Sequence, residues 1–245
     1  ALPISCNEVT FMWNKKTKAV TFSFDDGVTQ DVRLIEILNR YGLKATFNIN
    51  SSLLGIKRQI TRNGVEVSHI KNKAKDVARI YAGHEVAVHT LTHPNLTEQD
   101  DDTVIYQVES DRQKLSELCG YEVIGMAYPC GGVNNDDRVA KIIRENTGVR
   151  YSRTITSTYN FEPQENLYRF NPTVYYIEVE KLFELGQKFL ELPDDGQDRI
   201  FYIWGHSYEM DAGYISWEKF EEFCRMISGH EDIFYGTNKE VLLAH

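Results

Sequence analysis

The sequence predicts an α/β protein with a mainly parallel sheet, of the size expected for a single barrel. Short β-branched or aromatic segments alternate with segments whose apolar residues recur at helical spacing, which is typical of parallel strands joined by right-handed crossovers. The chain has 245 residues, of which 42% are apolar, enough for one large core. No linker-like composition and no solenoid repeat divides it. We therefore predict one domain over residues 1–245.

The first strand is expected over residues 19–24 (AVTFSF), which are β-branched and aromatic and end at an Asp-Asp-Gly turn. Residues 29–40 follow with apolar positions near helical spacing, and Gly42 stops this helix. The second strand covers residues 45–49 (ATFNI). This order of strand, helix and strand is one parallel repeat.

A polar loop is predicted over residues 55–73, and a helix is predicted near 74–82. The third strand covers 85–88 (EVAV), which is short and apolar enough for a buried strand. A long helix is then expected over 98–118, and the Thr97 hydroxyl is a candidate N-cap for it. The repeat of strand and helix thus continues through the middle of the chain.

The fourth strand is expected over 123–128 and ends at Pro129. Asn135 or Asp136 can cap the next helix, over 137–146. Further strands are expected near 149–153, near 173–177 and over 200–204, with helices over 179–191 and, as the last element, 216–228.

Charge and hydropathy exclude several classes of partner. Lysine and arginine total 27 and aspartate and glutamate total 36, so the formal net charge is −9. Such a chain repels phosphate backbones and anionic lipid surfaces, so nucleic acid is not an expected partner. No stretch reaches the roughly 18 consecutive apolar residues that span a bilayer. Neutral or cationic ligands fit better, and many glycans are neutral.

The four cysteines, at positions 6, 119, 130 and 224, form no CxxC pair and no disulfide ladder, and we interpret them as mostly reduced thiols. The chain opens with Ala-Leu-Pro-Ile-Ser-Cys, without a basic start and an apolar segment. We therefore expect a cytoplasmic protein, or a secreted one if a leader was removed before Ala1. The sequence does not indicate an oligomeric state.

Polar residues follow several predicted strands directly, and in parallel barrels the carboxyl ends of the strands share one rim. Asp25 and Asp26 are adjacent at the end of the first strand. Two neighbouring carboxylates repel each other unless a cation is close. Because consecutive residues leaving a strand point in different directions, one can face a metal and the other a substrate. By itself, an Asp-Gly pair is equally typical of a solvated turn.

His89 and His93 are four residues apart after the third strand, so both imidazoles can reach one ion. Two histidines and one aspartate leave metal positions open, which is typical of catalytic sites. The same set also holds ferrous iron in oxygenases, which gives an alternative redox hypothesis. His206 follows the strand at 200–204 and joins the site only if the strands share a rim. The other histidines, at positions 69, 84, 230 and 245, are expected to be structural or exposed.

Four segments resemble motifs of the NodB-homology polysaccharide deacetylases (carbohydrate esterase family 4). Residues 22–27 (FSFDDG), 89–93 (HTLTH) and 128–131 (YPCG) look like the first three motifs of the family, and 204–206 (WGH) looks like the fifth. The motifs occur in the family's order and together span about residues 19–207. One short motif would be weak evidence, whereas four in order are specific.

The resemblance implies a distorted (β/α) barrel with fewer than eight repeats. It also implies a metal-dependent hydrolase that removes acetyl groups from an acetylated oligosaccharide or polysaccharide. The divalent ion, zinc first and Co²⁺, Ni²⁺ or Mn²⁺ as alternatives, would bind Asp26, His89 and His93. Asp25 would be the general base and His206 the general acid.

The same resemblance assigns residues around the substrate. The backbone N–H of Cys130 would stabilise the oxyanion, Trp204 would form a wall of the acetyl pocket, and Tyr128 would lie beside it.

The sequence departs from the family pattern at two places. The family's arginine, two residues before the proline of the third motif, is replaced by Ala127; Arg153 or Arg150 can take over its contact with the catalytic aspartate. The Asp-Trp fourth motif is absent from residues 150–165, and Glu209 or Asp211 can orient the acid histidine instead.

Alternative functions remain open at this point. The same site can cleave N-acetylated amino sugars or O-acetylated xylan. A catalytically impaired glycan-binding protein on the same barrel is a second hypothesis, which the lost arginine favours. The retained Asp25 and His206 count against it, since a binder needs neither base nor acid. An iron-dependent redox enzyme would leave Asp25 without a role.

Overall fold

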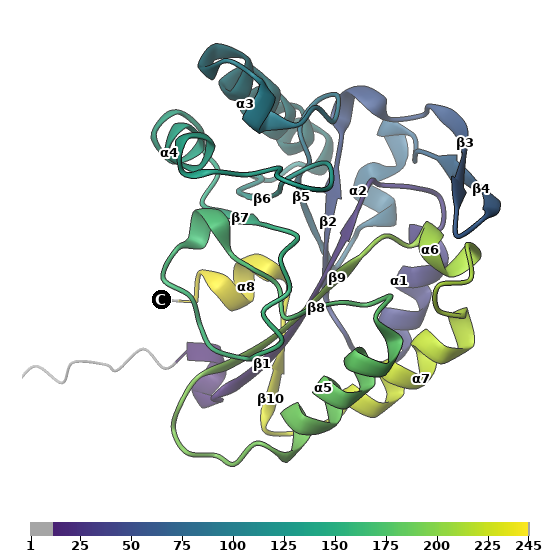
Figure 1. Cartoon of the computed structure of the whole chain (residues 1–245), viewed down its shortest axis with the longest axis vertical. Helices are drawn as coiled ribbons and strands as arrows, with labels where there is room; N and C mark the ends of the chain where they lie inside the picture. Colours follow the sequence, from purple (N-terminus) through teal and green to yellow (C-terminus); the bar gives the residue numbers. More distant parts are fainter. Residues whose placement is uncertain (1–11, 245) are drawn as a thin grey trace, which may run out of the picture.

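The computed structural model describes residues 12–244 (Figure 1). The strands are β1 (Lys18–Asp25), β2 (Ala45–Ile49), β3 (Lys57–Arg62), β4 (Val65–Ile70), β5 (Glu85–Val88), β6 (Gly125–Ala127), β7 (Tyr151–Arg153), β8 (Val174–Tyr175), β9 (Arg199–Gly205) and β10 (Ile233–Tyr235). The α-helices are α1 (Asp31–Arg40), α2 (Val77–Ile80), α3 (Asp101–Cys119), α4 (Asp137–Asn146), α5 (Val179–Glu191), α6 (Tyr208–Asp211), α7 (Trp217–Ile227) and α8 (Asn238–Leu242). Short 3-10 segments occupy Met12–Lys15, Ser51–Leu53, Ala74–Asp76, Leu96–Glu98 and Leu167–Arg169.

The main sheet is parallel and has the strand order β7-β6-β5-β2-β1-β9-β8. One edge of β1 is shared: residues 18–20 pair with β10, and residues 22–25 pair with β2. The sheet curls into a distorted (β/α) barrel with seven strands along its path, as the family resemblance implied. The carboxyl ends of the parallel strands therefore lie along one rim.

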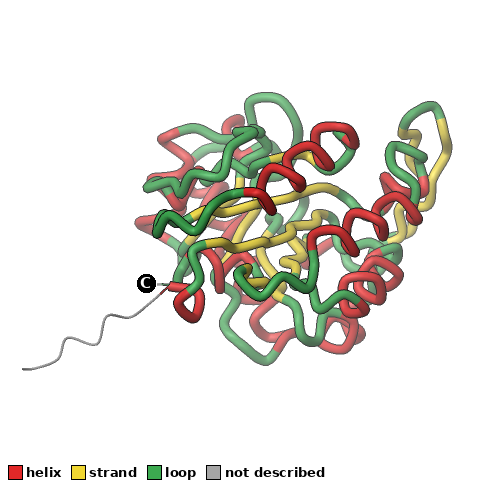
Figure 2. Tube along the Cα trace, turned by 90° about the horizontal axis from the view of Figure 1, so that it is seen from below, coloured by secondary structure: helices red, strands yellow, loops and turns green. Residues whose placement is uncertain are grey.

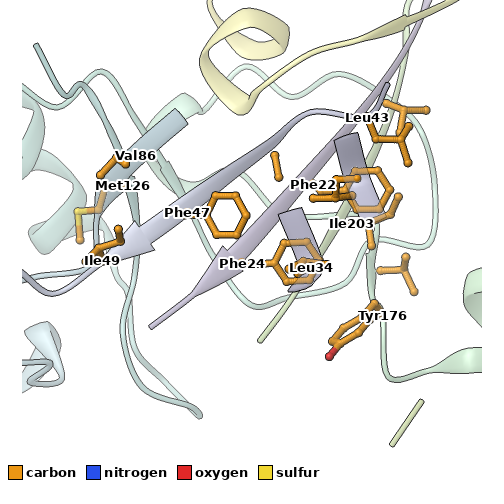
Figure 3. Close-up of a cluster of buried hydrophobic side chains, with 14 of the residues drawn as sticks. Phe22, Phe24, Leu34, Leu43, Phe47, Ile49, Val86, Met126, Tyr176 and Ile203 are labelled. Carbon is orange, nitrogen blue, oxygen red and sulfur yellow. The ribbon is translucent and has the colours of Figure 1, made fainter. Parts of the chain in front are cut away.

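The core is built on β1, in which all eight residues are buried. Figure 3 shows the aromatic side chains that fill the space beside it. The Phe24 ring stacks on Phe47 of β2 at 6.1 Å, and Phe22 meets Phe220 of α7 edge to face at 6.3 Å. Burying each such ring contributes roughly 2 kcal/mol, so the strand that carries the acidic pair is firmly held.

Helices cover the outside of the strands. Seen along a second direction, the strands of the main sheet run through the middle of the molecule, with helices and loops around them (Figure 2). Helix α7 packs against α1 and α5 on one side, and α3 packs against α4 and β5 on the other. No helix within residues 12–244 is both long and apolar enough to cross a bilayer.

Helix capping agrees with the sequence for α4 and differs for α3. Asp136 caps α4 by accepting a hydrogen bond from the Val139 N–H at 2.7 Å. The prediction that Thr97 caps the long helix was wrong, because Thr97 lies in a separate 3-10 turn. Asp100 caps α3 and accepts from the Thr103 N–H at 2.7 Å.

The prediction of a polar loop over residues 55–73 was wrong. These residues contain the antiparallel hairpin β3–β4, whose two-residue turn is Asn63-Gly64 with φ values of 53° and 71°. An Asn-Gly pair between alternating segments is a strong signal for a hairpin. The prediction of a loop considered only the polar composition of the segment. The hairpin lies beside α6, at the same end of the molecule as the end of β1 (Figure 1).

The expectation that the helix at 216–228 is the last element was also wrong. Strand β10 and helix α8 follow it, and α8 begins with a capping box between Thr237 and Glu240. Both elements are too short to show a period in the sequence. The cysteines at 119, 130 and 224 are free thiols, and Cys6 lies outside the described residues.

Candidate active site

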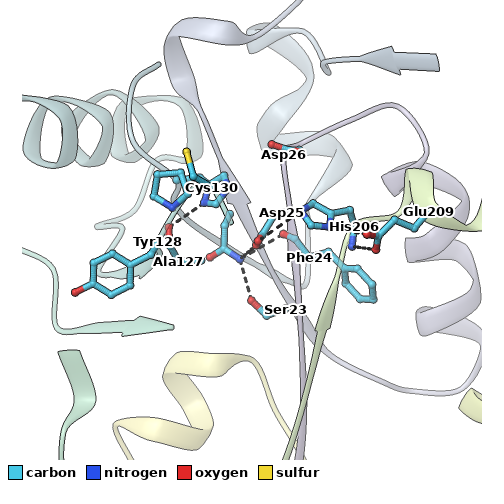
Figure 4. A network of polar contacts seen from close by, with 12 residues as sticks. Ser23, Phe24, Asp25, Asp26, Ala127, Tyr128, Cys130, His206 and Glu209 are labelled. Atoms are coloured by element: carbon cyan, nitrogen blue, oxygen red, sulfur yellow. Dashed lines mark hydrogen bonds and ion pairs between the residues drawn. The ribbon is translucent and has the colours of Figure 1, made fainter. Parts of the chain in front are cut away.

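The acidic pair lies where β1 ends, and its two carboxylates diverge. Asp25 is the last residue of β1, and Asp26 follows with a φ of 86°, in the left-handed region that is costly for a non-glycine residue. The turn sends Asp25 towards Arg153 and Asp26 towards Lys71. Figure 4 shows the two aspartates apart from each other at the end of the strand. The two side chains thus occupy different environments, as expected from their position.

Asp25 forms a buried ion pair with Arg153. Arg153 Nη2 lies 2.5 Å from both carboxylate oxygens, and the Asn48 amide donates to Oδ1 at 2.8 Å. Burial alone would raise the pKa of Asp25, but Arg153, His89 and His206 outweigh it and hold the pKa below its usual value. A carboxylate held ionised in this way is suited to accept a proton.

Arg153 reaches Asp25 from a strand next to the expected position. In the register of β6 and β7, Ala127 pairs with Arg153. Arg153 therefore lies beside the position at which the family arginine is missing, whereas Arg150 is exposed. The Arg153 guanidinium also lies over the Trp204 ring, 4.5 Å from its centroid.

Asp26, His89 and His93 come together as a metal-type ligand set. One ligand atom from each lies within 4.8 Å of the others. The Nδ1 atom of His89 is 2.9 Å from the Ala127 carbonyl oxygen, which fixes the tautomer with Nε2 free to bind a metal. Burial lowers the pKa of His89, and burial together with His89 lowers that of His93 to about 4. Both imidazoles are therefore neutral near pH 7, and the set fits a divalent ion with open positions.

The loop that carries the two histidines is held by buried polar groups. Thr90 and His93 have φ values of 67° and 65°, so this segment is strained. The Asn50 amide donates to the carbonyl oxygens of His89 and Thr90, and the Asp111 carboxylate accepts from the His89 N–H at 3.2 Å. Sequence reasoning missed Asn50 and Asp111, because nothing local to either residue indicates the contact.

Asp26 has two further basic neighbours, both on or next to β4. Lys71 Nζ is 3.2 Å from Oδ1 and 2.6 Å from the Asp26 carbonyl oxygen, and His69 Nε2 is 3.2 Å from Oδ2. Burial would raise the pKa of Asp26, but Lys71 and His69 bring it well below its usual value. His69, which was expected to be structural or exposed, is partly buried and contacts Asp26, because the β3–β4 hairpin brings it to the site.

His84 and His230 agree with that expectation. The Nδ1 atom of His84 accepts from the Ala45 N–H, and Nε2 of His230 lies 3.0 Å from the Met226 carbonyl oxygen. His245 lies outside the described residues.

His206 follows β9 and is oriented by Glu209. The Nδ1 atom is 3.1 Å from Glu209 Oε1, and the His206 N–H donates to Oε2 at 2.9 Å. This contact turns Nε2 towards Asp25, 4.0 Å from Oδ2. Asp211, the other candidate, accepts instead from the Trp217 indole N–H at 2.9 Å.

The surroundings of this pair change the pKa of both members. Burial lowers the pKa of His206, against the opposing effect of Asp26 and Asp25, and burial raises the pKa of Glu209 well above its usual value. Both shifts favour the uncharged form of the group concerned, and Tyr175 donates to the same Glu209 oxygen that contacts Nδ1.

A cavity of about 390 Å³ joins these groups, and Tyr128, Cys130 and Trp204 line it. The Tyr128 hydroxyl donates to the Tyr168 carbonyl oxygen at 2.8 Å, so this side chain is structural and contributes mainly its ring. Cys130 has a φ of 70°, and its N–H has no acceptor within residues 12–244. Trp204 stacks on Tyr175, with 4.1 Å between ring centroids.

The chain is similar to known proteins in sequence. The family model described as polysaccharide deacetylase matches residues 13–151, more than half of the chain. The peptidoglycan-N-acetylglucosamine deacetylase PgdA of Listeria monocytogenes is 29% identical over 122 residues, which cover 49% of this chain and 23% of that protein. A chitooligosaccharide deacetylase of Azorhizobium caulinodans is 30% identical over 104 residues, 42% of each chain. The aligned segments thus span less than half the length of either relative.

Solved structures share the fold over most of the chain. A family 4 carbohydrate esterase from Streptomyces lividans, in complex with acetate, has a TM-score of 0.56 at 15% identity and covers 90% of this chain and 93% of its own. A family 4 pseudoenzyme from Bacillus anthracis has a TM-score of 0.52 at 18% identity, covering 92% of this chain and 66% of its own. At these identities the likeness concerns the fold alone.

Proposed function

The chain belongs to the polysaccharide deacetylase family, and we propose that it is a metal-dependent hydrolase that removes acetyl groups from an N-acetylated carbohydrate. One observation carries the proposal. An ionised carboxylate, a histidine and a three-residue metal ligand set face one cavity of about 390 Å³. A glycan-binding site would need none of these groups in this arrangement.

The metal would bind Asp26, His89 and His93. A divalent ion bound there would supply Lewis-acid chemistry, polarising the acetyl carbonyl group and acidifying a bound water. The neutral imidazoles and the ionised Asp26 are in the protonation states that a cation requires. Zinc suits this donor set, with Co²⁺, Ni²⁺ or Mn²⁺ as alternatives.

Asp25 would act as the general base. Its carboxylate is kept ionised by Arg153, and it accepts the proton that the attacking water loses. Arg153 and Asn48 both contact this carboxylate and fix its orientation. The base is therefore set in place before the substrate binds.

Three other groups would contact the acetyl group or the leaving group. The free N–H of Cys130 donates to the oxygen on which negative charge develops. His206, oriented by Glu209, gives a proton to the leaving nitrogen from the side facing Asp25. Trp204, stacked on Tyr175, forms an apolar wall suited to the acetyl methyl group.

The substrate class follows from the relatives. The two sequence relatives are named a peptidoglycan-N-acetylglucosamine deacetylase and a chitooligosaccharide deacetylase, and the first of these names favours an amide substrate over an O-acetylated one. The alternative of a catalytically impaired glycan-binding protein rested on the absence of the family's arginine at position 127. The contact of Arg153 with Asp25 removes that argument.

The test is acetate release from N-acetylglucosamine oligomers and from acetylated xylan, with and without a chelator. We expect chelator-sensitive acetate from the N-acetylated oligomers, restored by adding Zn²⁺. Release from xylan alone would make the protein an esterase. No acetate from any substrate, with metal bound to the protein, would support the glycan-binding alternative.

A further inference from the structure

A second cavity lies next to the candidate active site, under the β3–β4 hairpin. It has a volume of about 330 Å³, and Arg58, Arg62 and Tyr208 are among its lining residues. Asp26, His93, Arg62 and Tyr208 line both this cavity and the active-site cavity. A ligand can therefore occupy both cavities at once.

The hairpin register explains why the arginines face this cavity. Side chains at alternate positions share a face, so Arg58, Ile60 and Arg62 of β3 lie on the same side. Arg58 is paired with His69, and Ile60 with Val67, so these β4 residues lie on that side too. The hairpin therefore presents an apolar centre with an arginine on either side of it.

The positive charge on this wall is only partly neutralised. Lys71 and His69 contact Asp26, which is the sole acidic residue among those lining the cavity. Within residues 12–244, neither Arg58 nor Arg62 has a carboxylate within ion-pair distance, although Arg62 lies over the Tyr208 ring at 6.0 Å. Two cationic side chains thus face a cavity in a protein whose net charge is −9.

We propose that this cavity is a subsite for an anionic group, a carboxylate or a phosphate ester, carried by the acetylated glycan. The inference rests on the proposed deacetylase function of the adjoining site. A guanidinium presents a planar pair of donors that matches both anions. Ile60 and Tyr208 offer the apolar surface on which a sugar ring can lie. The anionic group would belong to the acetylated sugar or to the sugar next to it.

The test compares binding of charged and neutral oligosaccharides. The probes are a tetrasaccharide of alternating N-acetylglucosamine and glucuronic acid with its carboxyl-reduced form, and an N-acetylglucosamine tetramer with and without a 6-phosphate. Titration calorimetry uses the full chain carrying Asp25→Asn, which blocks turnover. We expect at least one charged probe to bind roughly tenfold more tightly than its neutral partner, with the difference shrinking as salt is added.

Variants then locate the effect. Arg58→Gln and Arg62→Gln should reduce the ratio of affinities towards one, with unchanged thermal stability. Lys57→Gln, on the opposite face of the same strand, should keep the ratio and controls for the loss of one positive charge. A preference confined to one charged probe identifies the anion as carboxylate or phosphate.

The outcomes separate this inference from the proposed function. Equal binding of charged and neutral probes, binding of none, or a ratio that survives both arginine substitutions would overturn the subsite. Acetate release from neutral oligomers would still support a deacetylase in each of those cases. Conversely, a charge preference without any acetate release would keep the subsite and argue against the deacetylase.

Discussion

Arg153 lies directly beside Ala127 in the register of β7 and β6, and its guanidinium pairs with the Asp25 carboxylate across the end of the sheet. An arginine expected on one strand is thus supplied by its neighbour, at the same height along the sheet. Both side chains of the ion pair are buried, with exposures of 0% and 2%. An arginine thus contacts Asp25 although the position of the family's arginine, 127, holds alanine.

Replacing Arg153 with glutamine tests this contact. The change leaves Asp25 buried without its main partner, so the free energy of unfolding should fall by about 3–5 kcal/mol. Because Arg153 lowers the pKa of Asp25, its loss should raise that pKa and move the acidic limb of kcat/KM to higher pH. Arg150→Gln, three residues away and exposed, is the matched control for both measurements. If the acidic limb of kcat/KM stays at the same pH in a folded Arg153→Gln variant, Arg153 does not set the pKa of Asp25.

Two substitutions separate the role proposed for Asp25 from that proposed for the metal ligands. Asp25→Asn should lower kcat by about 10²–10⁴ and retain bound metal, because Asp25 is not in the ligand set. His93→Ala should lose the metal itself. Metal content by elemental analysis and acetate release measure the two effects. The assignment fails if Asp25→Asn keeps full activity or if His93→Ala binds metal like the wild type.

Glu209→Gln tests the orientation of His206. Burial raises the pKa of Glu209 well above its usual value, so Glu209 has a titratable proton beside His206 Nδ1 that glutamine cannot give up. In the glutamine variant the part of the pH profile that follows the ionisation of Glu209 should disappear, and kcat should fall at least about tenfold. Asp211→Asn, whose side chain contacts Trp217 instead, should leave the profile unchanged. Identical profiles for both variants would exclude a role for Glu209.

Asp31 provides a prediction for stability rather than catalysis. Burial raises its pKa to about 7, against hydrogen bonds from Ser207 and Tyr81. Between its ordinary value of 3.8 and about 7, the folded state keeps a proton that the unfolded state has lost. The contribution of Asp31 to the free energy of unfolding is therefore fully present below pH 3.8. It decreases by about 1.4 kcal/mol per pH unit up to about pH 7.

Asp31→Asn cannot ionise and should abolish this pH dependence. Denaturation at pH 5 and pH 8 should show the wild type losing more of its free energy of unfolding over that interval than the variant. Asp102→Asn, at the exposed start of α3, controls for the change in net charge. Parallel pH dependences for the wild type and Asp31→Asn would mean that Asp31 ionises normally.

The alternating strands and helices, and the motif residues at strand ends, were predictable from the sequence. These features depend on local sequence. The strands are β-branched segments that end at Asp-Asp-Gly or at histidine, and the helices between them have apolar residues at helical spacing. The hairpin was predictable in principle, because Asn63-Gly64 is a local signal, but its polar strands resembled a loop. The short elements after residue 228 carry too few residues for a period to emerge.

The sequence by itself determined the parallel repeat and indicated Asp26, His89 and His93 as candidate ligands, because local spacing and side-chain chemistry point to them. The roles of Asp25 as base and His206 as acid were implied by the family resemblance. Only the tertiary structure decided which arginine pairs with Asp25, because that choice depends on the register of β7 beside β6. The same holds for His69 and Lys71, which reach Asp26 from a hairpin about 45 residues further along the chain. Contacts between distant segments are set by strand order and packing, which no local pattern encodes.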